Sequence, residues 1–456
     1  MKMTIKSILA SAIIYFFLSN TISAQCWMKF AAGNTYSAAI LDDSTFWAWG
    51  NNTYGQQGNG TTASLNYPIN GNSETNWEKI SIGENHTVLL KNDGTIWTMG
   101  ENSNGQLGIG NTTNQNIPVQ VGTASDWMEI SAGVRHTLAI KTNGTLWAWG
   151  FNSNGQLGDS TTTDRLTPVQ IGTSTDWQKV EVGGNTSGAI KSNGSLWLWG
   201  FNGYGQVGDA SFTNKLVPTQ VGTDLNWKGV ALRYYHVLAV KTDGTLWSCG
   251  ANTNGQLGIG VSNTISQFQQ IGSDTNWDKI AAGQTHSFAI KSNGTLWAWG
   301  RNLFGQLGIG NTTDSNIPVQ VGTDNNWIEV ESGNDHAFAL KNNFTLFAWG
   351  MNGSGQFGNN TFTSSDSPTQ INCPTQTSAI ELSLEKADLV IYPNPTSSNL
   401  NIEVNEQTQI TIVNVLGEVV KKETINGLST IDVTELTSGV YFIQSTTGIK
   451  TKFIKQ

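Results

Sequence analysis

Short runs of alternating apolar and polar residues dominate this chain. One 50-residue segment starts with Trp77–Gly83 and continues with His86–Leu90, Thr95–Gly100 and Ile117–Val121. Alternation with a period of two residues predicts β-strands that bury one face. The segment therefore predicts four short strands. Its Asp93-Gly94 pair predicts a type I′ hairpin turn, which has positive φ at both central residues.

The same segment occurs seven times at intervals of 50 residues, with copies that begin at 27, 77, 127, 177, 227, 277 and 327. A fixed period of this length indicates one supersecondary unit that buries its apolar face only against its neighbours. Four strands in each of seven units predict an all-β fold, a seven-bladed β-propeller. The alternative is an open solenoid, which needs atypical polar caps, whereas the first and last copies here are ordinary repeats.

All 18 tryptophans and all five histidines occupy fixed positions of the repeat. We expect the tryptophans to pack between blades, each burying about 150–250 Å². Sugar-stacking platforms, the rival interpretation, predict a tryptophan outside these positions, and there is none. Metal ligands must converge on one ion, which side chains spaced around a ring do not do. We therefore expect no metal site, and buried imidazoles bonded to neighbouring backbone. The histidines are His86, His136, His236, His286 and His336.

The ends of the chain differ from the repeats. Residues 1–24 combine Lys2 and Lys6 with a short apolar stretch and a plausible cleavage site at Ala24, which predicts a secretory signal peptide. No other apolar run approaches the 18 residues that suggest a membrane span. Residues 25–373 then form the predicted propeller.

Composition changes after the propeller, since no tryptophan follows Trp349. Residues 374–388 are polar and predict a linker. Residues 389–456 predict a small β-sandwich of short strands separated by turn residues. The expected strands are Leu400–Val404, Gln409–Val415, Val419–Thr424, Ser429–Val433, Val440–Gln444 and Lys450–Ile454.

Three cysteines fit a closed ring in an exported protein. If the ring closes, Cys373 falls three residues short of the position equivalent to Cys26. The two ends then meet at one blade seam, and we predict a Cys26–Cys373 disulfide. Cys249 occupies a tryptophan position, which predicts a buried free thiol.

The propeller segment is acidic, with 24 Asp and Glu against 16 Lys and Arg. It lacks the basic footprint of a DNA binder, so we expect no nucleic-acid partner. No nucleophile elbow, phosphate loop, zinc signature or calcium loop occurs. We therefore expect no catalytic residue and no cofactor. Isolated acids such as Glu84, Glu101 and Asp335 fall in variable positions, and sequence does not pair them as a glycosidase requires.

Three positions of the repeat vary freely between copies: the residue after the signature glycine, the pair before the histidine position, and a pair inside the glycine-rich loop. Aromatic residues and arginines at such positions are the types that dominate binding hot spots. Neutral drift on solvated loops is the alternative. The candidate binding residues are Tyr54, Arg135, Phe151, Phe201, Tyr204, Arg233, Tyr234, Tyr235, Arg301 and Phe304.

The repeat resembles the regulator of chromosome condensation repeat. The matching residues are Gly133–His136, Asn143–Gly150 and Asn152–Gly158, and the resemblance covers Trp27 to about Cys373. It implies a propeller that offers loops to partner macromolecules. The family's nucleotide exchange and chromatin binding are not expected here, because the propeller is acidic and carries an export signal.

The C-terminal segment resembles the sorting domain of type IX secretion cargo. The matching motif residues include Tyr392, Pro393, Asn394, Pro395, Gly439 and Tyr441. The resemblance implies a Bacteroidetes-type host, recognition by the type IX machinery, and cargo that is released or attached to the cell surface. A small adhesion module is the alternative.

Together these features predict a secreted or surface-displayed propeller that binds an extracellular protein or glycan without catalysis. The alternatives are a secreted enzyme that degrades polysaccharides or peptides, and a structural component of the surface or matrix.

Overall fold

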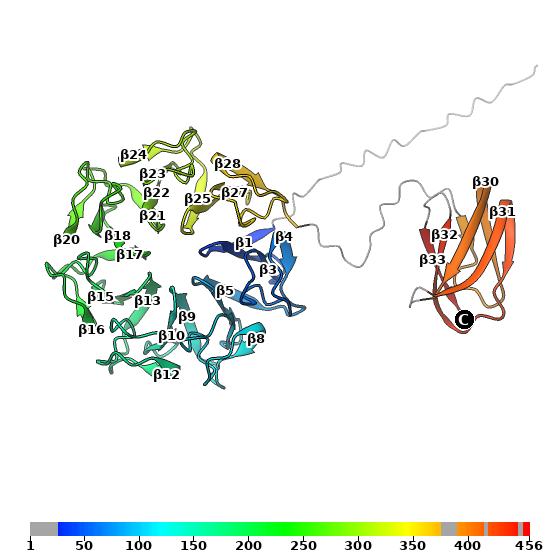
Figure 1. Cartoon of the computed structure of the whole chain (residues 1–456), viewed down its shortest axis with the longest axis horizontal. Coiled ribbons are helices and arrows are strands. Elements are labelled where there is room, and N and C mark those ends of the chain that lie inside the picture. Colours follow the sequence, from blue (N-terminus) through cyan, green and yellow to red (C-terminus); the bar gives the residue numbers. More distant parts are fainter. Residues whose placement is uncertain (1–25, 375–389, 415–417, 446–449) are drawn as a thin grey trace, which may run out of the picture. The chain divides into compact units, whose positions relative to one another are not determined.

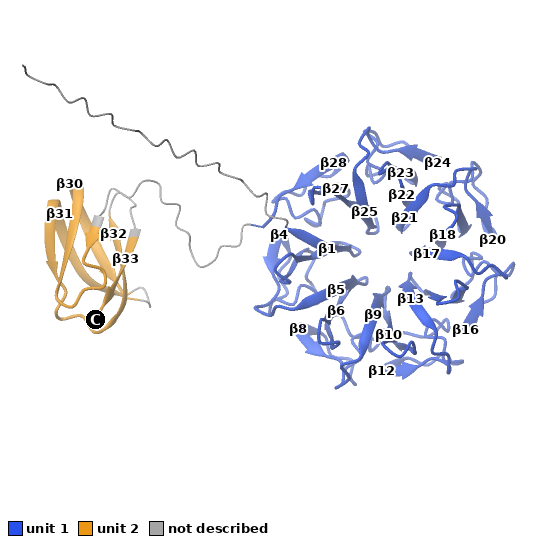
Figure 2. Ribbon diagram, turned by 180° about the vertical axis from the view of Figure 1, so that it is seen from behind, with its two compact units in different colours: residues 1–374 blue, residues 375–456 orange. Residues whose placement is uncertain are grey.

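The computed structural model of the protein describes residues 26–374, 390–414, 418–445 and 450–456. Within these residues every regular element is a β-strand. The chain divides into two compact units, Met1–Pro374 and Thr375–Gln456, which Figure 2 shows in separate colours. The predicted signal peptide lies outside the described residues, as does the predicted linker except for Pro374.

Seven four-stranded antiparallel sheets make up the larger unit, and each sheet uses four consecutive strands. Figure 1 shows them as blades around a ring. The innermost strands are β1 (Trp27–Ala32), β5 (Trp77–Ile82), β9 (Trp127–Ala132), β13 (Trp177–Val182), β17 (Trp227–Leu232), β21 (Trp277–Ala282) and β25 (Trp327–Ser332). The second strands are β2 (Tyr36–Leu41), β6 (His86–Lys91), β10 (His136–Lys141), β14 (Thr186–Lys191), β18 (His236–Lys241), β22 (His286–Lys291) and β26 (His336–Lys341).

The third strands carry the signature and end on its glycine. They are β3 (Phe46–Gly50), β7 (Ile96–Gly100), β11 (Leu146–Gly150), β15 (Leu196–Gly200), β19 (Leu246–Gly250), β23 (Leu296–Gly300) and β27 (Leu346–Gly350). The outer strands are β4 (Leu65–Asn70), β8 (Gln115–Gln120), β12 (Arg165–Gln170), β16 (Lys215–Gln220), β20 (Ile265–Gln270), β24 (Ser315–Gln320) and β28 (Ser365–Ile371). β8 begins two residues before the predicted Ile117.

The prediction of a seven-bladed all-β ring is confirmed. Trp27 and Phe30 of the first blade share one core cluster with Phe338, Leu340 and Ile371 of the seventh. The open solenoid is therefore wrong, because the two ends of the repeat array bury each other.

The hairpin turn between the second and third strands differs from the prediction. In the second blade Lys91 N–H donates to the Thr95 carbonyl and Gly94 N–H to the Lys91 carbonyl, both at 3.0 Å. Of the two central residues only Gly94 has positive φ, at 77°. This pattern is a type I turn followed by a glycine bulge. The predicted type I′ turn is wrong, because the Asp93 carboxylate bonds forward to the Thr95 N–H at 2.9 Å.

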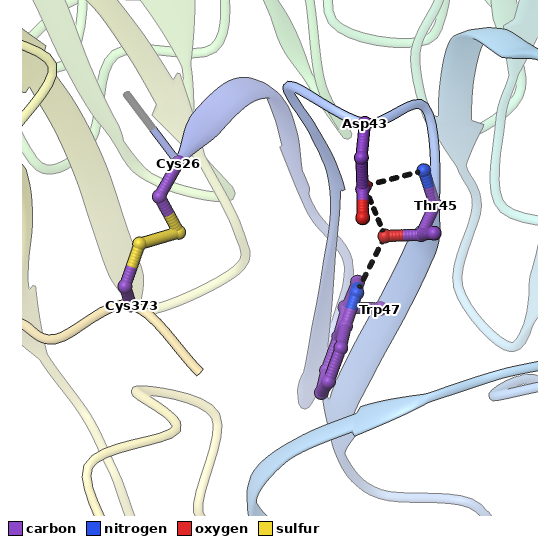
Figure 3. Close-up of a disulfide and its surroundings, with 5 residues drawn as sticks. All are labelled: Cys26, Asp43, Thr45, Trp47 and Cys373. Carbon is purple, nitrogen blue, oxygen red and sulfur yellow. Dashed lines mark hydrogen bonds between the residues drawn. A yellow bond between two sulfur atoms is a disulfide. The ribbon is translucent and has the colours of Figure 1, made fainter. Parts of the chain in front are cut away.

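The first blade makes the same turn without glycine (Figure 3). The Asp43 carboxylate accepts from the Thr45 N–H at 3.0 Å and from its hydroxyl at 2.5 Å. The Trp47 indole N–H donates to the same hydroxyl at 2.8 Å. Ser44 takes the glycine position with φ of 62°, as Phe344 does at 61° in the last blade. The hydrogen bonds that run from Asp43 through Thr45 to Trp47 hold the turn. In the blades between these two, the glycine at the Ser44 position only relieves backbone strain.

A disulfide joins Cys26 to Cys373, with 6.0 Å between their α-carbons (Figure 3). It links the residue before β1 to the second residue after β28, so the ring is closed covalently as well as by packing. Cys249 is a buried free thiol.

A four-part contact, which we call the seam latch, joins neighbouring blades. In the third blade His136 Nε2 lies 2.9 Å from the hydroxyl of Ser187 in the fourth. That hydroxyl donates to the Gln156 carbonyl of the third blade at 2.7 Å, and the Trp199 indole N–H donates to the same carbonyl at 3.0 Å. Because the hydroxyl's one proton goes to the carbonyl, His136 must donate from Nε2.

The latch corrects the expectation for the histidine position. The imidazoles are buried as predicted, but they bond to side-chain hydroxyls of the next blade rather than to backbone. The other three pairs at this position of the repeat are His86–Thr137, His236–Ser287 and His336–Ser37, at 3.2, 2.8 and 3.2 Å. At the seam between blades six and seven the hydroxyl of Ser332 takes this place, 2.9 Å from His286.

The seam between the fourth and fifth blades has lost all three side chains of the latch together. Thr186 replaces the histidine, Val237 the hydroxyl and Cys249 the tryptophan. The Thr186 hydroxyl donates instead to the Phe201 carbonyl at 2.8 Å. The Gln206 carbonyl of this seam keeps one weak donor, the Cys249 thiol at 3.6 Å.

The tryptophans lie at the seams as predicted. Trp149, Trp199 and Trp299 have no exposed surface, and those that open each first strand are nearly as buried. The remaining position, represented by Trp97, is partly exposed. There the Lys91 ammonium lies 4.8 Å from the Trp77 ring centroid and 4.4 Å from that of Trp97. Such cation–π contacts cover the indole faces that a sugar would need.

The smaller unit is all-β, as expected, but its strands are longer than predicted. The strands are β29 (Val390–Tyr392), β30 (Asn399–Val413), β31 (Val419–Asp432), β32 (Gly439–Ser445) and β33 (Lys450–Lys455). β31 pairs along β30 on one edge, while β29 and β32 share its other edge. An irregularity between Val404 and Thr408 stands where the pattern predicted a strand break. A core that includes Leu400, Ile412 and Phe453 holds the unit together.

We expect the double substitution of Cys26 and Cys373 by serine to lower the free energy of unfolding by about 2–5 kcal/mol, because the bridge restricts the unfolded chain. Urea titration under non-reducing conditions measures the change. Reduced wild-type protein is the control and should match the variant. An unchanged midpoint, or peptide mapping with both thiols free, contradicts the bridge.

Burial lowers the pKa of His136 to about 3, from an ordinary value of 6.5. Below pH 6.5 the unfolded chain therefore binds a proton that the folded chain does not, so stability is full above pH 6.5 and falls towards pH 3. His136→Thr with Ser187→Val copies the natural seam at Thr186 and Val237. We expect its loss of stability between pH 6.5 and 4.5 to be shallower by up to about 1.4 kcal/mol per pH unit. Equal slopes in urea titrations would disprove the neutral latch.

Candidate binding face

The three variable positions of the repeat lie on one face of the ring. The N–H after each signature glycine donates to the carbonyl of the residue before the histidine position, as in Phe201 to Asn185 and Ala251 to Tyr235, both at 2.8 Å. These bonds tie the loop after the third strand to the turn between the first and second strands. We call the face that carries both the loop face. All ten candidate binding residues belong to it.

Four of the candidates form a continuous row of rings on the fourth and fifth blades, which we call the aromatic row. Phe201 contacts Tyr204, with centroids 6.1 Å apart, and Tyr204 contacts Tyr235 at 5.0 Å. Tyr235 contacts Tyr234 at 5.7 Å. Tyr204 is 41 % exposed, and the other three rings are half-buried. The row crosses the seam that lacks the latch.

A polar cluster, which we call the axial plug, spans the channel at the loop face. Arg233 replaces a glycine that the other six blades keep, and its guanidinium donates to the Ala32 carbonyl at 3.3 Å and to the Asn334 side chain at 3.1 Å. Asn334 in turn donates to Asn34 at 2.5 Å. These contacts join the fifth blade to the first and seventh, across the ring.

Tyr234 belongs to both features. Its hydroxyl donates to the Glu84 carboxylate at 3.4 Å and lies 3.4 Å from the Asn334 amide. Gly184 makes room for it, because a β-carbon there would stand 3.2 Å from the Tyr234 ring. The aromatic row therefore ends at the ring axis, against a carboxylate of the second blade.

The channel behind the plug is a cavity of about 300 Å³ lined by the innermost strands. Glu181 and Glu331 face it from the fourth and seventh blades. Burial, with the nearby charge of Glu129, raises the pKa of Glu181 to about 8. Burial, with the charges of Glu181 and Glu329, raises the pKa of Glu331 well above its usual value. Glu181 therefore holds its proton at neutral pH.

The other candidates do not join the row. Among the described residues no ring contact links Tyr54, Phe151 or Phe304 to it, and Arg135 and Arg301 make no ion pair. Arg233 is a plug residue rather than an exposed anchor. Sequence reasoning missed Asn34, Asn334 and Gly184, whose only signal is their place in the same variable positions.

The described residues contain no group of three or more His, Cys, Asp or Glu placed to hold a metal ion. Every histidine belongs to the seams. The arrangement around the aromatic row offers apolar area, hydroxyls and the Glu84 carboxylate, which suits binding.

The predicted sorting residues hold the last strand of the smaller unit. The Asn394 amide donates to the Lys452 carbonyl at 3.1 Å, and its oxygen accepts from the Ile454 N–H at 2.9 Å. Tyr441 stacks on Phe453, with centroids 5.5 Å apart. Pro393 and Pro395 flank Asn394, Gly439 opens β32, and Tyr392 is exposed. Which of them the export machinery reads stays a prediction.

Family models cover most of the chain. The RCC1-like domain matches residues 172–388, and the regulator of chromosome condensation (RCC1) repeat matches 43–90, 93–140 and 143–190. A second model of that repeat matches 29–56, 77–106 and 129–156. The secretion system C-terminal sorting domain matches 390–456. The chain is an RCC1-repeat propeller with a C-terminal sorting domain.

Solved structures share the fold of this RCC1-repeat propeller. Prp20p from Saccharomyces cerevisiae has a TM-score of 0.66 and 20% identity, over 81% of this chain and 90% of that one. Yeast RCC1 (Prp20) bound to Kap60 has 0.65 and 18%, over 85% and 93%. Human WBSCR16 has 0.63 and 23%, over 68% and 85%. The comparison with curated proteins found no match.

The sorting domain marks the RCC1-repeat propeller as an exported protein handled by a type IX secretion system. In the part of the chain that the structure describes, no helix is long and apolar enough to cross a membrane.

We expect Asn334→Ala to lower the free energy of unfolding by about 1–3 kcal/mol, because it removes one of the two acceptors of the Arg233 guanidinium and the donor to the Asn34 side-chain oxygen. Gln284→Ala is the matched control, at the same position of the sixth blade, and should stay near wild type. Urea titration at pH 7.5 measures both. Equal losses in the two variants would show that the plug contributes nothing specific.

Proposed function

We propose that this exported propeller binds an extracellular protein through the aromatic row on its loop face. The observation that carries the proposal is the series of three ring contacts that joins Phe201, Tyr204, Tyr235 and Tyr234 across one seam. Tyrosine is enriched at the centres of protein interfaces, because it gives a large apolar area with little loss of side-chain freedom.

The geometry of the row favours a protein over a glycan. Neighbouring rings are tilted by 49–71° and press on one another. A sugar stacks on one flat, open ring face, whereas tilted rings offer ridges between which partner side chains fit. Prp20p, a ring of the same fold, was studied for its binding to Gsp1p and histones, which are proteins.

The position of the row supports the same proposal. The aromatic row lies where the repeat departs from its pattern. In the fifth blade Arg233 replaces the glycine of the other blades, and the seam between the fourth and fifth blades lacks the latch side chains. Residues that break a regular pattern and lose its standard contacts are expected at functional sites.

The proposal predicts that the double substitution Tyr204→Ala with Tyr235→Ala weakens capture of a partner at least 100-fold. Interface anchors of this kind contribute more than about 2 kcal/mol each to the binding free energy. The partner is captured from the extracellular fluid of the organism that secretes the protein. The full secreted protein is crosslinked, and captured chains are identified by mass spectrometry. Tyr67→Ala, an exposed tyrosine of β4 at 43 %, is the matched control.

If the double tyrosine variant captures the partner as well as the wild type and the Tyr67→Ala control do, the aromatic row is not the binding site. Turnover of polysaccharides or peptides by the purified protein would favour the alternative of a degradative enzyme. Capture of a glycan alone, lost in the double variant, would keep the face but change its partner.

A further inference from the structure

The aromatic row has a direction, because one end is apolar and the other meets a carboxylate. It begins at Phe201, runs over Tyr204 and Tyr235, and stops at Tyr234, whose hydroxyl reaches Glu84. The axial plug adjoins this end, because the Tyr234 hydroxyl lies 3.4 Å from the Asn334 amide, and it spans the channel mouth. A side chain that follows the row therefore meets the Glu84 carboxylate at this end.

Glu84 is poorly paired in the free protein. Its two hydrogen bonds, from the Asn34 amide and the Tyr234 hydroxyl, are both 3.4 Å long and both go to Oε1. No ion pair joins it to a lysine or arginine of the described residues. Burial raises the pKa of its carboxyl despite the opposing charge of Arg135. The desolvation of a carboxylate is offset when a cation binds beside it.

Two other acids of the loop face have closer partners than Glu84 has. Glu101 accepts from Asn85 at 3.0 Å and from Ser103 at 2.8 Å. Asp159 pairs with Arg165 at 2.7 Å. Glu84 therefore differs from acids that only fix the conformation of a loop.

We propose that the aromatic row and Glu84 together take a lysine or arginine side chain of the partner protein. Its apolar stem packs across Tyr235 and Tyr234, and its charge meets the Glu84 carboxylate. Long basic side chains bury their stems on apolar surface in this way, and tyrosine faces attract the cation. The inference rests on the proposed function and names the chemistry of the partner.

An acidic partner fits the row less well. The arginine next to it, Arg233, already gives its guanidinium to Ala32 and Asn334 within the plug. The propeller also carries eight more acidic than basic residues, which favours the approach of a basic surface.

The test selects a phage-displayed random peptide library on the full secreted protein. We expect the enriched peptides to share a lysine or arginine, and its replacement by acetyl-lysine or citrulline to weaken binding at least tenfold. Glu84→Gln, which keeps the shape of the side chain, should weaken the same peptides to a similar degree. Glu78→Gln, an exposed acid at the start of β5, is the control and should bind as wild type. Unchanged urea midpoints show that the variants fold.

The outcomes separate this inference from the proposed function. Peptides that need Tyr235 but bind equally well without their basic residue, or to Glu84→Gln, would overturn the inference and keep the binding face. Acidic peptides that depend on Arg135 would overturn it too. A library with no peptide that depends on Tyr235 overturns the inference, and if the double tyrosine variant also captures partners normally, the proposed function fails with it.

Discussion

Most seams of the ring depend on one backbone carbonyl in the glycine-rich loop. The Gln156 carbonyl receives both the Ser187 hydroxyl and the Trp199 indole of the next blade, while His136 supports the hydroxyl from behind. A blade cannot bury its two faces alone, so its stability comes from such seams. The latch sets the depth and register at which neighbouring sheets meet, and the tryptophans supply the buried area.

The seam without the latch is the one that carries the aromatic row. Thr186, Val237 and Cys249 replace the three latch side chains, and Phe268 packs against Trp227, with ring centroids 5.4 Å apart, in their neighbourhood. Apolar packing therefore replaces directed bonds there. Arg233 adds a tie across the axis from the same blade. Four seams keep the full latch, two keep part of it, with Tyr36 and Met99 or with Ser332 in place of latch residues, and the seam of the fourth and fifth blades keeps none of the three side chains.

The ring was predictable from sequence because every copy repeats the same buried pattern, so that strand type, blade number and closure all follow from the period. The Cys26–Cys373 contact followed from counting positions around the circle. The hairpin type was not predictable, since Asp93 bonds to Thr95 rather than adopting positive φ. The latch was missed because sequence shows a histidine position and a hydroxyl position without showing that they face each other across a seam.

The site was predictable only as a list of variable residues. Contacts between residues 150 or more apart, such as Tyr234 with Glu84, depend on which blades lie opposite one another. The length of the strands in the smaller unit was not predicted for a related reason. In the sequence the irregularity after Val404 resembles a turn, although pairing with β31 resumes beyond it.

The bridge between Cys26 and Cys373 spans 347 residues and makes the ring a covalent macrocycle. One proteolytic cut in an exposed loop opens this macrocycle, but the disulfide still joins the first blade to the seventh. Two cuts are needed before a fragment can leave. For a protein exported into surroundings that contain proteases, the bridge therefore preserves the ring after its first damage.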